Sequence, residues 1–274
     1  VFDDTLGPGW DEGDEAAWDR VDRIDDDRLR TLRRHGAEDL RALVAERGAG
    51  PVDPDALLVG FARRFATYKR ATLLLRHRAD LVELLADDDR PVQFVFAGKA
   101  HPADDDGKAL LAEIVVFSRS AESSGRFLFV PDYDMAVARA MYAGCDVWLN
   151  NPVRPHEASG TSGEKSALNG GLNCSISDGW WDEMADGRNG WTSPASGLGA
   201  PAARDRAESA SALDLLAGEI VTEFHGGDGP WSAAWIDRIR HNWRSLGPRV
   251  TAGRMVGDYV TRLYGPALDE VLDR

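Results

Sequence analysis

Residues 146–170 read DVWLNNPVRPHEASGTSGEKSALNG, and this stretch decides the fold. A short apolar run leads into a loop of small and hydroxyl residues, and a helix-like tail carries Lys165. Thr161, with Glu164 three residues later, fits a capping box that places a helix N-terminus here. Backbone N–H groups at such a helix start are where phosphate is held. The stretch predicts a phosphate-binding loop, although by itself it also fits an ordinary loop with a solvated lysine.

Strand and helix patterns alternate along the chain on both sides of this stretch. Apolar runs typical of buried strands lie at 56–61, 91–98, 126–133, 146–150 and 172–177. Helical patterns lie between them at 71–85, 106–119 and 134–144. Alternation at this spacing is typical of βαβ units. We therefore expect an α/β fold with a Rossmann-like parallel sheet flanked by helices.

The domain organisation follows from the flanking patterns. Residues 1–50 predict a helical connecting segment whose arginines lie on a solvated helix face. Residues 51–274 predict one Rossmann-like domain that holds the phosphate site and ends in helices. Within it, residues 194–209 resemble a flexible connector. The helices after this connector carry apolar faces, so we expect them to pack on the sheet.

A stretch rich in Asp, Gly and Trp follows the last apolar run. Residues 178–191, DGWWDEMADGRNGW, are typical of a loop. Their tryptophans could stack on a sugar, but packing inside the protein is the favoured interpretation. These residues are Trp180, Trp181 and Trp191.

Composition limits the possible partners. The formal net charge of −14 argues against nucleic acid and anionic lipid, so any anion site must be a local cluster of arginine and lysine. No apolar run approaches the roughly 18 residues that span a bilayer. Two cysteines make no disulfide framework and suit a reducing cytoplasm. Residue 1 is Val, and no secretory signal follows it, so we expect a fragment of a longer protein.

Four cations follow the first predicted strand within the run 62–70, ARRFATYKR. The carboxyl end of a parallel strand is where open α/β sheets bind ligands. The spacing alone leaves an anion site and a basic surface patch equally open. A second candidate anion loop, GKAHP at 98–102, follows the next strand.

The string EASGTSGEKSALNGGLN at 157–173 resembles the pyridoxal-phosphate segment of the α-glucan phosphorylases, which act on glycogen, starch and maltodextrin. The likeness covers nearly the whole chain and is nearest to the bacterial short-type enzymes. It implies the C-terminal domain of a GT-B type glycosyltransferase. It also implies that Lys165 carries pyridoxal 5′-phosphate as a Schiff base. The family usually has Met where this chain has Glu164, and a carboxylate facing the phosphate would oppose cofactor binding.

The resemblance also assigns roles residue by residue. It implies that Arg63 lies near the cofactor phosphate, that Tyr133 packs beside the cofactor, and that Arg64 and Lys69 hold the substrate phosphate. It implies catalytic roles for Lys165, Arg64 and Lys69, and no metal. Backbone N–H groups that face the anions are expected at Gly160, Thr161, Ser162 and Gly163. Groups that bind the glucose are expected at Glu157, Ser159 and Gly160.

The reaction implied by the resemblance is phosphorolysis by a hexosyltransferase. Inorganic phosphate cleaves the terminal α-1,4-linked glucose from a glucan and releases glucose 1-phosphate. The family's amino-terminal domain supplies the other wall of the cleft and is missing from these residues, so we expect this chain alone to have little activity. A nucleotide-sugar glycosyltransferase of the same architecture is the alternative, and a non-catalytic carbohydrate-binding domain is a third. The transferases use E-x7-E, whereas the spacing from Glu157 here ends at Lys165, which favours the phosphorylase.

Overall fold

The centre of the fold is a sheet of six parallel strands in the order β3-β2-β1-β4-β5-β6. The computed structural model describes residues 2–197, 199–227 and 229–272. The strands are β1 Leu57–Ala62, β2 Val92–Ala97, β3 Phe127–Val130, β4 Val147–Asn150, β5 Leu172–Ile176 and β6 Gly190–Ser193. The prediction of a Rossmann-like α/β fold is confirmed, because this strand order and the parallel pairing are those of a doubly wound sheet.

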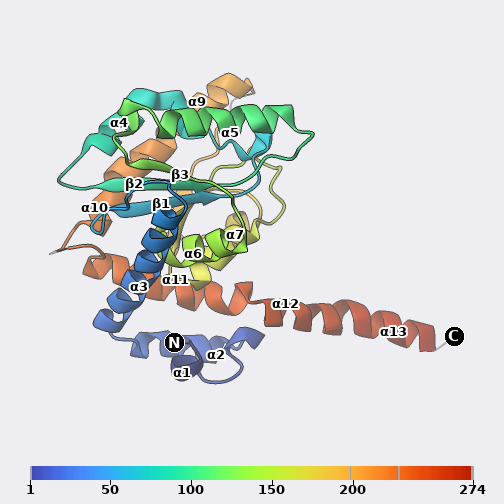
Figure 1. The fold of residues 1–274 in the computed structure, drawn as a ribbon. Coiled ribbons are helices and arrows are strands. Elements are labelled where there is room, and N and C mark those ends of the chain that lie inside the picture. Colours follow the sequence, from blue (N-terminus) through green and yellow to red (C-terminus); the bar gives the residue numbers. More distant parts are fainter. Residues whose placement is uncertain (1, 198, 228, 273–274) are drawn as a thin grey trace.

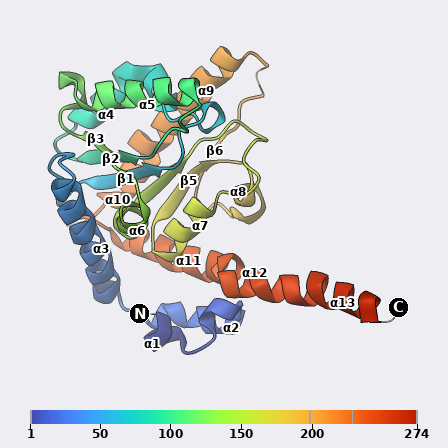
Figure 2. The same cartoon turned by 45° about the vertical axis from the view of Figure 1, so that its right-hand side comes forward.

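Helices lie on both sides of the sheet (Figures 1 and 2). The helices are α1 Phe2–Leu6, α2 Glu15–Trp18, α3 Asp26–Glu46, α4 Arg78–Ala86, α5 Asp105–Ser118, α6 Met135–Gly144, α7 Thr161–Leu168, α8 Trp180–Met184, α9 Pro201–Leu215, α10 Val221–Phe224, α11 Ala233–Val250, α12 Ala252–Tyr259 and α13 Gly265–Leu272. Within the described residues, no helix is long and apolar enough to cross a membrane.

Each face of the sheet has its own apolar layer. On one face the rings of Phe61 and Phe96 stack at 4.8 Å, and Phe117 of α5 packs edge-on against Phe127. On the other face, buried residues of α3 and α6 pack on the sheet beside Trp148. Strands covered on both faces consist of nearly continuous apolar runs. The runs were therefore visible in the sequence.

The strand order reverses between β1 and β4, which are neighbours in the sheet although two strands and their helices separate them in sequence. β2 and β3 lie on one side of β1, while β5 and β6 lie beyond β4. The loops that leave the carboxyl ends of β1 and β4 therefore start side by side. Ligands of open α/β sheets bind at such a switch point.

Helix α3 is joined to the sheet by a buried ion pair. Arg33 was predicted to lie on a solvated helix face, and that prediction is wrong, because Arg33 is buried and forms an ion pair of 3.1 Å with Asp146 at the start of β4. The charge pattern of a helix does not indicate which arginine meets a carboxylate 113 positions away. Trp231 also donates to Asp146, at 2.7 Å, so three distant segments meet at one carboxylate.

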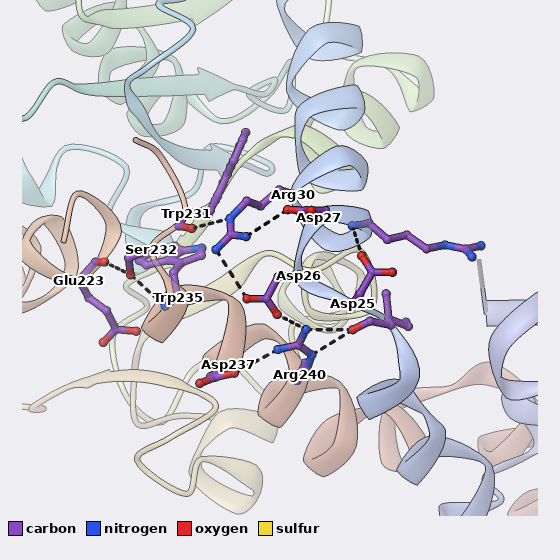
Figure 3. A network of polar contacts seen from close by, with 12 residues as sticks. Asp25, Asp26, Asp27, Arg30, Glu223, Trp231, Ser232, Trp235, Asp237 and Arg240 are labelled. Carbon is purple, nitrogen blue, oxygen red and sulfur yellow. Dashed lines mark hydrogen bonds and ion pairs between the residues drawn. The ribbon is translucent and has the colours of Figure 1, made fainter. Parts of the chain in front are cut away.

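The first turn of α3 is also tied to α11 by a more exposed network, which Figure 3 shows. Asp26 accepts from Arg240 of α11 at 2.5 Å and lies 3.7 Å from Arg30. Arg30 in turn donates to the carbonyl oxygen of Trp231 at 3.3 Å. This network is therefore continuous with the buried ion pair through Trp231.

Three predictions about the second half of the chain need correction. The stretch 178–191 is not only a loop, because it contains α8 and the start of β6, although its tryptophans are buried as predicted. The connector ends at Ala200 rather than at residue 209, since α9 begins at Pro201, and residue 198 lies outside the described residues. Helices α9 and α11 pack on the body as expected. The first turn of α12 lies against Asp11 and Gly13, but the rest of α12 and α13 extend away from the body (Figures 1 and 2), and Val256 is 51% exposed.

Candidate active site

The loop after β1 places a buried cation at the switch point. Arg63 is 7% exposed, and its guanidinium lies 5.1 Å from the centre of the Phe61 ring. Burial lowers the pKa of this guanidinium, and the nearby Glu157 carboxylate raises it in part. The contacts of Arg63 are long, at 3.5 Å to Glu157 and 3.4 Å to Ser162 Oγ, and its Nε has no hydrogen-bond partner among the described residues. Such a guanidinium has donors to spare for an anion.

The loop after β4 brings a carboxylate to the same place. Glu157 is 8% exposed, and its backbone N–H donates to Asp178 at 2.9 Å, which fixes the loop. Its Oε2 accepts from Lys69 Nζ at 2.6 Å. The two loops therefore meet through three charged side chains, Lys69, Arg63 and Glu157. These three are the charges at the β1–β4 switch point.

Helix α7 begins at Thr161, as predicted, but its cap differs from the prediction. The N-cap residue is Gly160 in the left-handed conformation, with φ of 98°, and no side chain caps the helix. The predicted capping box of Thr161 and Glu164 is therefore wrong. A glycine supplies the positive φ at low steric cost, which leaves the side chains of the first turn free for other contacts. Ser162 Oγ accepts from Trp148 Nε1 at 3.2 Å and thereby points toward Arg63.

Lys165 lies on the exposed side of α7, next to α6. Its Nζ is 5.9 Å from the centre of the Tyr142 ring. Both residues line a cavity of about 550 Å³ together with Tyr133 and Asn169. Burial raises the pKa of Tyr142, with a further contribution from its neighbour Tyr133, so the phenol is neutral. The cavity presents an amine and two phenol rings, which suits a planar ligand with a carbonyl group.

Tyr142 is the site residue that the sequence analysis missed. It lies on α6, four residues after Ala138, and both residues line the cavity beside Lys165. Residues four apart on a helix share a face. The signal was present in the sequence as an amphipathic helix directly before β4, but nothing local indicates which ligand that face meets.

Glu164 points away from the charges at the switch point. It is half-buried in a groove of about 770 Å³ between α7 and α12, together with Ser159 and Thr161. Burial raises the pKa of the Glu164 carboxyl, while Arg254 and Lys165 lower it. The carboxylate that replaces the usual Met therefore faces α12 and not Arg63.

The structure separates the predicted site residues into groups. It brings together Arg63, Lys69, Glu157 and Ser162 at the switch point. Lys165 and Tyr133 share the cavity beside α6. Arg64 is exposed, and within the described ranges its side chain has no hydrogen-bond or ion-pair partner. Gly163 lies against β5, where an added Cβ would come within 2.5 Å of Asn173 Oδ1.

Lysine is rare in this chain, and its positions are informative. Of the 32 basic residues only four are lysine. Three of them, Lys69, Lys99 and Lys165, follow the carboxyl ends of β1, β2 and β4, and the fourth is Lys108 on α5. Among the described residues, no group of three or more His, Cys, Asp or Glu side chains could hold a metal ion. Three of the four lysines thus lie at the edge of the sheet that contains the switch point.

The sequence is similar to known proteins over most of its length. The family model for carbohydrate phosphorylase matches residues 15–188. A glycogen phosphorylase of Mycobacterium tuberculosis (strain H37Rv) is 48% identical over 271 residues, which cover 92% of this chain and 31% of that protein. A maltodextrin phosphorylase of Thermococcus litoralis is 40% identical over 267 residues, covering 93% of this chain and 32% of that protein. The chain thus spans about a third of the length of the relatives it matches.

Proposed function

Since this chain belongs to the carbohydrate phosphorylase family, we propose that it is the phosphate-handling part of an α-glucan phosphorylase. The substrates would be inorganic phosphate and glycogen, starch or maltodextrin, and the product glucose 1-phosphate. The observation that carries the proposal is the cluster of Arg63, Lys69 and Glu157 at the switch point. The Lys165 amine lies on α7, the helix that follows the Glu157 loop. The buried, unpaired thiols of Cys145 and Cys174 support a cytoplasmic location.

Pyridoxal 5′-phosphate fits the residues that are present. Lys165 offers a primary amine for covalent attachment, and the cavity between Tyr133 and Tyr142 offers flat walls for a pyridine ring. Arg63 offers a buried guanidinium with an unused donor for the phosphate. Glu164 presents no obstacle, because it faces α12. When bound, the cofactor supplies acid–base chemistry through its 5′-phosphate group.

The chain's own residues would manage the charges. Two phosphates that lie side by side repel each other strongly, so cations must compensate them. Arg63 would serve the cofactor phosphate, while Lys69 and Arg64 would hold the substrate phosphate, and the backbone of residues 160–163 would face both. Lys69 now has Glu157 as its partner at 2.6 Å. An incoming phosphate would replace that carboxylate at Lys69 and release Glu157 to accept hydrogen bonds from glucose hydroxyls.

The bond changes define what the site must achieve. The bond between the anomeric carbon and the glycosidic oxygen breaks, and a phosphate oxygen bonds to that carbon with retention of configuration. The proton carried by the substrate phosphate goes to the departing glycosidic oxygen. Lys69 and Arg64 would hold the phosphate where both transfers are possible. The remaining wall of the cleft would come from segments that these relatives have and this chain does not cover.

Covalent labelling tests the proposal on this chain alone. The protein is incubated with pyridoxal 5′-phosphate and reduced with borohydride, and the labelled peptide is identified by mass spectrometry. We expect the label on Lys165, a visible absorption band before reduction, and loss of both in Lys165→Ala. Lys108→Ala is the matched control and keeps both. A chain that stays colourless, or carries the label equally on all four lysines, contradicts the proposal.

Activity assays separate the proposal from its alternative. The chain alone is expected to form little glucose 1-phosphate, because it spans about a third of its relatives. A protein that also contains the remaining segments is expected to form glucose 1-phosphate from glucan and inorganic phosphate. Release of a nucleoside diphosphate from a nucleotide sugar would instead support the glycosyltransferase alternative.

A further inference from the structure

Arg70 is the fourth cation of the run after β1, and the site described so far does not use it. It is 5% exposed, and its backbone adopts the left-handed conformation with φ of 49°. This conformation is uncommon for a residue other than glycine. It turns the Arg70 side chain into the protein, whereas Lys69 beside it pairs with Glu157. Two consecutive cations are thus directed to different partners.

The guanidinium of Arg70 joins the two loops of the switch point. Its Nε donates to the carbonyl oxygen of Asn151 at 2.9 Å, and its Nη2 donates to that of Pro152 at 2.8 Å. The side-chain amide of Asn151 donates back to the Arg70 carbonyl oxygen at 3.0 Å. The backbone N–H of Val153 donates to the carbonyl oxygen of Tyr68 at 2.7 Å. These four bonds hold residues 68–70, which include Lys69, against residues 151–153, which precede Glu157.

Two carboxylates of α9 hold the other side of the same guanidinium. Asp205 accepts from Arg70 at 2.9 Å, and Glu208 lies 2.5 Å from it. Glu208 is buried and also accepts from the backbone N–H of Ser196 at 2.7 Å. The charge of Arg70 is therefore compensated twice and is not available to a ligand. Its contacts fix the orientation of the loops.

We propose that Arg70 is a positioning residue that sets the distance between Lys69 and Glu157 and so builds the phosphate-binding side of the site. The functional part rests on the proposed function, in which Lys69 holds the substrate phosphate. Only arginine fits this position, because its planar fork donates in four directions at once. A lysine has one compact charge and three donors on a single atom. Without the Arg70 guanidinium the loops keep only the bonds from the Asn151 amide and the Val153 N–H, so the Lys69 ammonium is held less firmly next to the carboxylate.

Lysine acylation read by mass spectrometry tests the proposal, because the chain has only four lysines. In the unaltered chain, Lys69 is expected to react slowly, since a partner at 2.6 Å holds it. In Arg70→Gln we expect the Lys69 rate to rise about tenfold, the ratio that matches loss of one hydrogen bond to a charged group. The rate at the exposed Lys108 is expected to stay the same. Inorganic phosphate at saturating concentration should protect Lys69 in the unaltered chain and protect it much less in the variant.

Arg126→Gln is the matched control for loss of stability. Arg126 also donates to two backbone carbonyls and one carboxylate. It precedes the edge strand β3, however, whereas Arg70 follows the carboxyl end of the central strand β1. Its loss is expected to lower the melting temperature without changing the relative rate at Lys69. Arg70→Lys, which keeps the charge, gives a second test and should fall between Arg70→Gln and the unaltered chain.

Two results would overturn the proposal. One is a Lys69 rate that is the same in both Arg70 variants as in Arg126→Gln. The other is a rise at all four lysines together, because that indicates general unfolding. The cofactor labelling of Lys165 is a separate measurement. Loss of that labelling with Lys69 still dependent on Arg70 would refute the proposed function alone, and the opposite result would refute the positioning role alone.

Discussion

Two buried arginine–carboxylate pairs lie at opposite ends of β1 and β4, and they differ in how completely they are bonded. At the amino ends, Arg33 pairs with Asp146, and at the carboxyl ends Arg63 pairs with Glu157. The terminal nitrogens of Arg33 make four hydrogen bonds of 2.7–3.1 Å, to Ala143, Cys145, Asp146 and Asn169. Those of Arg63 reach only a carboxylate at 3.5 Å and a hydroxyl at 3.4 Å.

The difference separates structural support from ligand binding. Asp146 is also saturated, because it accepts from the Leu58 backbone at 3.0 Å and from Trp231 at 2.7 Å. Both guanidinium groups leave Nε without a partner among the described residues, so the difference lies in their terminal nitrogens. A buried charge whose terminal nitrogens are all engaged at short distances has little capacity for a ligand and stabilises the arrangement around it. A buried charge with long contacts is costly unless another group arrives. Arg63 is therefore poised for an anion, and Arg33 is not.

The largest expected effect is at the Arg33–Asp146 pair. Arg33→Leu should lower the free energy of unfolding by about 3–5 kcal/mol, because it leaves the Asp146 carboxylate buried without its counter-charge. Denaturant unfolding followed by tryptophan fluorescence measures this loss. A change below about 1 kcal/mol would show that the two pairs do not differ in the way described here.

The stability of the Arg63–Glu157 pair should respond more to a ligand than to mutation of Arg63. Arg63→Met is expected to change the free energy of unfolding by less than about 1 kcal/mol, because Glu157 retains Lys69 at 2.6 Å. Pyridoxal 5′-phosphate at a hundredfold excess over its Kd should stabilise the unaltered chain by about 2.7 kcal/mol and the variant much less. Thermal shift with and without the ligand compares the two. Equal stabilisation of both proteins would remove Arg63 from the phosphate site.

The packing of α7 gives a test of intermediate size. Gly163→Ala places a Cβ within 2.5 Å of Asn173 Oδ1 and 3.0 Å of the Trp180 ring. Overpacking of this kind costs about 1–3 kcal/mol, and it should also weaken covalent labelling of Lys165 two residues away. Gly218→Ala, where an added Cβ meets nothing within 4 Å, is the control. Normal labelling in Gly163→Ala would show that α7 tolerates a shift.

The smallest expected effect is at Glu164 and depends on pH. Burial raises the pKa of this carboxyl above its ordinary value of 4.5, so the unfolded chain releases the proton first. Glu164 therefore lowers stability as pH rises above about 4.5 through its raised pKa, and not below that range. Glu164→Met should be more stable at neutral pH by less than about 1 kcal/mol, since the group is half exposed. Unfolding curves at pH 4 and pH 7 should show a difference only at pH 7.

Much of the fold was predictable because the strands are buried on both faces. Four of the six strands, β1 to β4, are nearly continuous apolar runs, and β5, LNCSI, has apolar residues at alternate positions. The strand β6, GWTS, escaped because it is short and half polar. The burial of Arg33 escaped because its partner lies far away in sequence and is chosen by tertiary packing. The extension of α13 and most of α12 away from the body was not predicted, because an apolar helix face does not specify what covers it.

The sequence supplied candidate residues for the site but not their grouping. A family resemblance supplied Lys165, Lys69 and Glu157, although 88 positions separate the last two. Nothing local indicates that Glu164 faces α12 or that Tyr142 faces the Lys165 amine. Both depend on how α7 packs against α6 and α12. The role of Arg70 depends on a left-handed backbone conformation at a residue other than glycine, which the sequence does not specify.

The bonding of the terminal nitrogens of Arg33 has a practical consequence for cloning. An expression clone that starts at Pro51 would look reasonable from the helix boundary, because α3 ends at Glu46. Its product would nevertheless retain the buried Asp146 carboxylate without the Arg33 guanidinium that pairs with it. The carbonyl oxygens of Ala143, Cys145 and Asn169 would lose their donor at the same time. Such a shortened polypeptide should be recovered from inclusion bodies, whereas one that keeps α3 should not.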